Sequence, residues 1–88
     1  MITRDIIVQN ELGLHIRIAG TIVKEMKKFE SSIMVMQDGT AHNFKNVTGV
    51  VSTNGKKGDV LTFEFDGPDE ECAADAVEEL FASKFGER

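Results

Sequence analysis

The sequence predicts an α+β fold with one four-stranded, mainly antiparallel sheet that helices cover on one face and that is open to water on the other. The apolar periodicity indicates the element order β-α-β-β-α-β-α. Residues 60–66 alternate so cleanly between apolar and polar side chains that one face of this strand must be wet. A length of 88 residues with 41% hydrophobic content suits one core without a deep enclosed cavity. We therefore expect an open-faced two-layer β-sandwich that occupies residues 1–88 as one domain.

Four segments have the composition of strands: residues 2–9, 32–37, 40–44 and 60–66. The first is rich in β-branched residues and places Ile2, Ile6 and Val8 on one face. The pair Asp38-Gly39 separates the second segment from the third, and it favours a type I′ hairpin because both central residues need positive φ. The last strand has three apolar residues that point toward the core: Leu61, Phe63 and Phe65.

Apolar residues at helical spacing predict three helices. Within residues 16–29 they form one stripe: Ala19, Ile22, Val23, Met26 and Phe29. Residues 46–53 form two turns that open with Asn46, a good N-cap residue. The last helix follows Gly67-Pro68, with Asp69 as its expected N-cap and acidic residues in its first turn that suit the positive end of the helix dipole. Its buried side is expected to comprise Ala73, Ala76, Val77, Leu80 and Phe81.

Charge and composition exclude several classes of function. Lys and Arg number 10 against 15 Asp and Glu, and a net charge of −5 argues against nucleic-acid binding, which needs a basic surface. No segment approaches the length of about eighteen apolar residues that a membrane span needs, so no membrane insertion is expected. Cys72 is the only cysteine, which leaves no internal disulfide and fits a reducing, cytoplasmic compartment. His42 has no Cys or second His nearby, so we expect no metal site. No cofactor is expected either.

Residues 10–24 contain the chemically informative pattern, because a Gly-containing loop delivers His15 to the start of a helix. The first backbone N–H groups of a helix lack intrahelical acceptors, and the dipole end there is positive, so a dianion is stabilised. The amides of Ile16, Arg17 and Ile18 are the expected phosphate-binding groups. The imidazole is a nucleophile at neutral pH, and Arg17 adds a planar cation for phosphate oxygens. A lone histidine at a helix start more commonly caps the helix or fills the surface; Gly13 and Arg17 favour the phosphoryl-accepting interpretation.

The run GLHIRIA, followed by an amphipathic helix, resembles the active-site signature of the histidine-containing phosphocarrier (HPr) family of the bacterial phosphotransferase system. The resemblance extends over the whole sequence, through the Asp-Gly hairpin, the short helix after Lys45, the Lys57-Gly58 turn and the capped last helix. It implies that His15 accepts a phosphoryl group from enzyme I, itself charged by phosphoenolpyruvate, and passes it to an enzyme IIA-type acceptor with the help of Arg17. We expect a monomeric covalent carrier, not an enzyme that turns over a small molecule.

Three positions depart from the family pattern, which usually has Ala and Pro where this protein has Ile16 and Ile18. On a helical wheel these two residues lie about 80° either side of the buried stripe. Both are therefore expected to be partly exposed beside His15, where a partner would bury them. The third is Asn46, because many Gram-positive relatives carry at this position a serine that a regulatory kinase phosphorylates. Asparagine keeps the N-cap role but cannot accept a phosphoryl group.

We expect partners to dock on a surface formed by Ile16, Ile18, Lys24, Val47, Thr48 and Val51. For Val47 and Val51 the alternative is burial of one of them in the core, and for the basic stripe of Arg17, Lys24 and Lys28 it is an ordinary solvated helix face. The alternative function is a regulatory docking module with the HPr fold. The tail LFASKFGER resembles the nitrogen-related branch of the family. A small-ligand-sensing domain is disfavoured, because it would not require the His15 and Arg17 pair.

Overall fold

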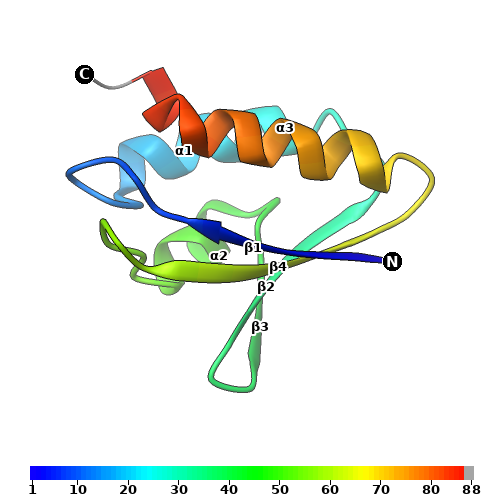
Figure 1. The fold of residues 1–88 in the computed structure, drawn as a ribbon, viewed down its shortest axis with the longest axis horizontal. Helices are drawn as coiled ribbons and strands as arrows, with labels where there is room; N and C mark the ends of the chain where they lie inside the picture. The colour runs from blue at the N-terminus through cyan, green and yellow to red at the C-terminus, as the bar shows by residue number, and fades with distance from the viewer. Residues whose placement is uncertain (87–88) are drawn as a thin grey trace.

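The computed structural model describes residues 1–86 and has the expected order of strands and helices (Figure 1). Its elements are β1 (Ile2–Ile7), α1 (Ile16–Met26), β2 (Ser32–Gln37), β3 (Thr40–Asn43), α2 (Val47–Ser52), β4 (Val60–Asp66), α3 (Glu70–Ala82) and a short 3-10 helix, η1 (Lys84–Gly86). The strands form one sheet in the order β1-β4-β2-β3, and every neighbouring pair is antiparallel. Helices α1 and α3 cover one face of this sheet (Figure 1). The last two residues of the tail LFASKFGER lie outside the described part of the sequence.

The core lies between the two long helices and the covered face of the sheet. Its centre is Phe63 of β4, whose ring lies 4.9 Å from that of Phe44 and 5.6 Å from that of Phe81, both edge-on. The alternation predicted for β4 is confirmed, because Leu61, Phe63 and Phe65 are buried. The predicted helix stripes are largely confirmed too, although Ala76 and Leu80 are only half-buried and Ala74 joins the core instead.

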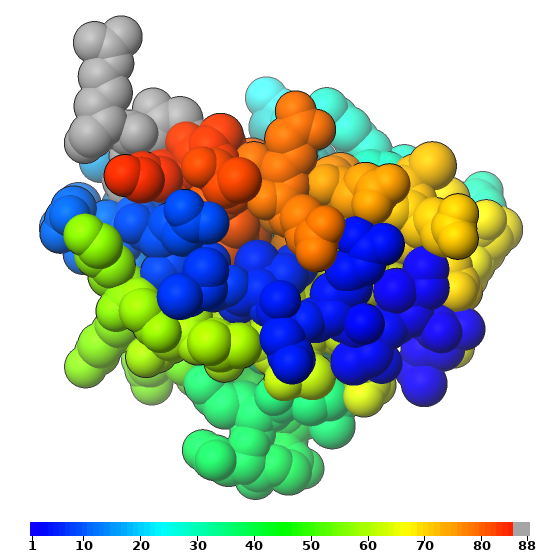
Figure 2. All heavy atoms as spheres, viewed as in Figure 1, coloured from blue at the N-terminus to red at the C-terminus, as the bar shows by residue number. Residues whose placement is uncertain are grey.

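The hairpin between β2 and β3 turns through Asp38 and Gly39, with φ values of 50° and 80°, so the predicted pair of positive φ angles is confirmed. Figure 2 shows this hairpin projecting from the body of the molecule. Three boundaries differ from prediction, and the first is that β1 ends at Ile7 and not at residue 9. Helix α1 ends at Met26, and Phe29 packs against the core from the loop that follows. Strand β3 ends at Asn43, although Phe44 N–H still donates to the Ile33 carbonyl at 2.9 Å.

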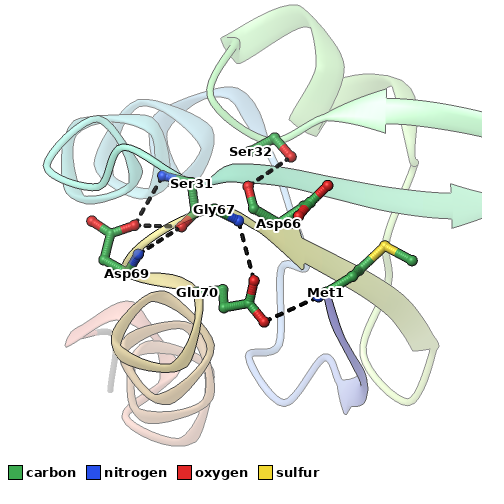
Figure 3. A network of polar contacts seen from close by, with 7 residues as sticks. All are labelled: Met1, Ser31, Ser32, Asp66, Gly67, Asp69 and Glu70. Carbon is green, nitrogen blue, oxygen red and sulfur yellow. Dashed lines mark hydrogen bonds and ion pairs between the residues drawn. The ribbon is translucent and has the colours of Figure 1, made fainter.

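Asp69 has the N-cap position of α3, but the prediction that its carboxylate caps the helix is wrong. Its backbone has φ −114° and ψ 29°, not the extended conformation that directs a capping group at the first turn. Its carboxylate accepts hydrogen bonds from the N–H and hydroxyl of Ser31 (Figure 3) and from the Glu30 N–H at 3.0 Å. These bonds, first the one from the Ser31 hydroxyl, lower the pKa of Asp69 to about 2. The carboxylate thus fastens the loop after α1 to the start of α3.

A second contact of this kind holds the N-terminal residue. The Glu70 carboxylate accepts a hydrogen bond from the Gly67 N–H at 3.2 Å and lies 3.2 Å from the Met1 amino group (Figure 3). Together these donors lower the pKa of Glu70. Across residues 1–86, no helix is both long enough and apolar enough to cross a membrane.

Candidate functional site

The loop between β1 and α1 is held against the loop that follows α2 (Figure 1). Leu14 N–H donates to the Gly55 carbonyl at 2.9 Å, and Gly13 has φ +67°. A Cβ at Gly13 would lie 2.3 Å from the Gly55 oxygen, so the close approach of the two backbones requires glycine. The buried side chain of Asn10 donates to the Gly13 carbonyl at 2.7 Å. Sequence reasoning missed Asn10 and Gly55, because their roles depend on contacts between distant segments.

This loop delivers His15 to the N-cap position of α1, with φ −79° and ψ 171°. The imidazole forms no hydrogen bond that caps the helix, so the capping role considered from the sequence is absent. The first helical hydrogen bond runs from Ala19 N–H to the His15 carbonyl at 2.9 Å. The amides of Ile16, Arg17 and Ile18 therefore have no acceptor within the helix, and the first turn of α1 carries no acidic residue. The arrangement favours a phosphate group held beside the His15 ring.

Arg17 is exposed, as predicted, and so is Lys24, about two turns further along α1. Lys28, the third member of the predicted basic stripe, lies 3.0 Å from the Glu25 carboxylate. This ion pair offsets part of its charge, so the positive potential of the stripe is concentrated at Arg17 and Lys24.

Four of the six predicted docking residues come together in one groove between α1 and α2. The groove has a volume of about 330 Å³ and is lined by Ile16, Val47, Thr48, Val51, Ser52 and Asn54. Ile16 is 72% exposed and Val47 is 36% exposed. Val47 lies outside the core, whereas Val51 is half-buried and packs against it; Val50 is the fully buried valine of α2. Ser52 and Asn54 were missed because the sequence was interpreted there only as the end of a helix.

The prediction that Ile18 is exposed beside His15 is wrong, because its side chain is only 4% exposed and belongs to the core. Ile16 and Ile18 lie on opposite sides of the α1 stripe, and Ile16 faces α2. The other side is closed by α3 and η1, which both contact α1. Sequence reasoning did not include η1, so it left the Ile18 side of the helix open to solvent. Lys24 does not line the groove.

Asn46 takes the predicted N-cap position of α2, and its side-chain oxygen accepts a hydrogen bond from Thr48 N–H at 2.8 Å. This capping prediction is confirmed.

Comparisons with known proteins identify one family. A family model described as the PTS HPr component phosphorylation site matches residues 2–83. Phosphocarrier protein HPr of Xylella fastidiosa is 37% identical over 87 residues, which cover 99% of this protein and 98% of the relative. The protein of the same name from Treponema pallidum is also 37% identical and is covered to 99%. The crystal structure of HPr-C-His from Thermoanaerobacter tengcongensis superposes with a TM-score of 0.92 at 38% identity, covering 100% of this protein and 99% of that one.

The match extends over nearly the whole sequence and includes residue identity as well as fold. Proteins that share only an architecture need not share residues in this way. The chain therefore belongs to the HPr family of phosphocarrier proteins of the phosphotransferase system.

Proposed function

We propose that His15 is the residue that carries the phosphoryl group. The observation that carries this proposal is the backbone at the start of α1, where an extended N-cap residue is followed by three amides without intrahelical acceptors. A ring nitrogen of His15 attacks the phosphorus of a donor phosphohistidine; the new N–P bond forms as the donor N–P bond breaks. The acceptor's nucleophile later repeats the same exchange on His15. No free product or hydrolysis step is needed.

The residues around His15 act by position and charge. The amides of Ile16, Arg17 and Ile18 lie at the positive end of α1 and favour the dianion. The Arg17 guanidinium provides two donors in a plane that matches phosphate oxygens. Phosphoryl transfer requires mainly orientation and electrostatic stabilisation, so these groups suffice without a cofactor.

We assign partner docking to the groove between α1 and α2. The 72% exposed side chain of Ile16 adjoins two further apolar residues in this groove, the 36% exposed Val47 and the half-buried Val51, and apolar side chains gathered in one exposed place mark interaction sites. A partner that covers Ile16, Val47 and Val51 would exclude water beside His15, and Lys24 would contact its acidic rim. The family membership supports enzyme I as the donor, an enzyme IIA-type protein as the acceptor, and the cytoplasm as the location.

The decisive experiment is phosphorylation with phosphoenolpyruvate and a cognate enzyme I, followed by intact-mass analysis. We expect one phosphoryl group, labile in acid and stable in base, as a phosphohistidine is. His15→Ala should accept none. His42→Ala is the matched control, because His42 is the only other histidine and lies in β3. An unmodified parent protein, with an enzyme I proven active on another carrier, would overturn the proposal, and so would an adduct on His15→Ala.

A further inference from the structure

The segment that follows α2 contains the pair Asn54-Gly55, the only asparagine in the sequence that is followed by glycine. Asn54 has φ +52°, in the left-handed region that non-glycine residues adopt infrequently and that Asn and Asp tolerate best. Its N–H donates to the Val51 carbonyl at 3.0 Å, as expected for the first residue past a helix. The side chain is exposed and borders the groove beside Ile16.

The hydrogen bonds of the four asparagines separate Asn54 from the others. Asn10 donates to the Gly13 carbonyl, Asn43 accepts from Lys45 N–H, and Asn46 accepts from Thr48 N–H. Within residues 1–86, neither the side-chain amide of Asn54 nor the backbone N–H of Gly55 takes part in a hydrogen bond. An amide carbon and a backbone nitrogen that could attack it are therefore adjacent in sequence, and neither is engaged elsewhere.

We propose that Asn54 deamidates spontaneously and that this slow modification changes the charge and the backbone at the edge of the docking groove. The Gly55 nitrogen loses its proton and attacks the amide carbonyl carbon of Asn54, and the new bond between them closes a five-membered ring. The bond from that carbon to the amide nitrogen of Asn54 breaks, and ammonia leaves with the proton. Water then opens the resulting succinimide at either carbonyl, which produces aspartate or isoaspartate. The reaction consumes one water, releases one ammonia and needs no oxidant or reductant.

Glycine at position 55 assists the first step, because it has no side chain to hinder the attacking nitrogen. The residues after the other asparagines are Glu11, Phe44 and Val47, each of which has a side chain that hinders the same attack. Asn54 therefore differs from the other asparagines in two ways. Its side-chain amide and the N–H of Gly55 form no hydrogen bond within residues 1–86, and the residue that follows it has no side chain.

The consequence for transfer rests on the function proposed above. Either product adds a negative charge at the edge of the groove, close to where a phosphoryl dianion would be held. Isoaspartate also inserts a methylene into the backbone directly before Gly55, whose carbonyl accepts the hydrogen bond from Leu14 N–H at 2.9 Å. That bond helps to place His15, so isoaspartate should disturb the site more than aspartate does.

The modification itself is tested without any phosphoryl transfer. Folded protein is aged at neutral and mildly alkaline pH, and peptide mapping follows the mass gain of an amide that becomes an acid at each asparagine. We expect conversion at Asn54 before any at Asn43 or Asn46, faster at the higher pH, together with an isoaspartate product. Asn54→Gln keeps an amide whose longer side chain does not form the five-membered ring, and Asn54→Gly suits the positive φ; neither should change. Conversion at Asn54 no earlier than at Asn43 would overturn the proposal.

The effect on function is measured on the aged form after ion exchange separates it by its extra charge. Phosphoryl uptake from enzyme I should slow by about two- to fourfold in Asn54→Asp, as expected for the solvent-screened repulsion between one added negative charge and a dianion. The isoaspartate form should be slower still. Equal rates for fresh protein, Asn54→Asp and isoaspartate protein would refute the effect on the groove. A fresh protein that accepts no phosphoryl group at all would instead refute the role of His15.

Discussion

Replacement of Arg17 should separate phosphoryl transfer from folding. Arg17 is the second residue of α1, is exposed, and forms no ion pair within the described residues. A cation in the first turn of a helix is disfavoured by the helix dipole, so Arg17 does not stabilise α1. We therefore expect Arg17→Ala to change the free energy of unfolding by no more than about 0.5 kcal/mol.

The expected loss of rate follows from the interaction that the guanidinium would make. A hydrogen bond to a charged group contributes about 1.5–3 kcal/mol, and about 1.4 kcal/mol corresponds to a factor of ten in rate. Arg17→Ala should therefore slow transfer by about 10- to 100-fold. Arg17→Lys keeps the charge but loses the planar pair of donors, so it should fall between the parent and Ala. Arg17→Glu reverses the charge and should be the slowest of the three.

Rapid-quench measurement of phosphoryl uptake tests the expected loss of transfer rate, and thermal melting tests the expected small change in stability. The matched control is Lys27→Ala, which removes one exposed cation from the opposite end of α1. This variant should lose a little stability, because Lys27 lies at the favourable end of the dipole, but it should transfer at the parent rate.

Parent rates in all three Arg17 variants would refute a chemical role for this residue. The helix-start amides would then have to hold the phosphoryl group alone. In that case Ile18→Pro, which deletes one of those donors, becomes the deciding variant. Because the Ile18 side chain is buried, Ile18→Val is needed as its control: it also removes core volume but keeps the N–H.

Three further predictions concern stability. Asn46→Ala should lower the free energy of unfolding by about 1 kcal/mol in denaturant titrations, whereas Asn46→Ser should be nearly neutral. The lowered pKa of Asp69 stabilises the fold above the ordinary carboxyl pKa, and this contribution should be lost as pH falls through about 2; in acid titrations Asp69→Asn should lack that part of the transition. Gly49→Ala should destabilise the fold, because a Cβ there would lie 2.1 Å from the Asn43 carbonyl oxygen. Gly20→Ala should instead stabilise it by about 0.5–1 kcal/mol, because apart from its chain neighbours and the adjacent helix backbone nothing lies within 4 Å of the added Cβ. Equal melting temperatures for the two alanine variants would contradict the steric argument.

The elements that the sequence predicted correctly are those in which a period repeats several times. In β4 the alternation runs through the whole strand, and in α1 the apolar stripe repeats at each turn. The same stripe misplaced the end of α1. Phe29 continues the apolar spacing, but it reaches the core from the loop after the backbone has left the helix. Periodicity therefore reports burial more directly than backbone conformation.

Two residues could not be placed from local sequence, because their partners are distant in sequence. Asp69 looked like an N-cap, but Glu30 and Ser31, 39 and 38 residues away, donate to its carboxylate instead. Ile18 looked half-exposed because a helical wheel treats both borders of a stripe alike. In the fold, α3 and η1 close one border and leave the other, at Ile16, to the groove.

The reactive residues of the site are close together in the sequence, whereas the segments that form the docking groove are far apart. His15 and Arg17 are two residues apart at one helix start, so a short motif is enough to identify them. The docking groove combines α1 with α2 and the segment that ends at Asn54, and Leu14 and Gly55 tie these parts together across 41 positions of sequence. The same hydrogen bond from Leu14 to Gly55 also holds the loop that leads into α1. A substitution in the segment that lines the groove can therefore shift the backbone of His15 without contacting the imidazole. Variants around residues 52–55 should therefore be judged by transfer rate as well as by partner affinity.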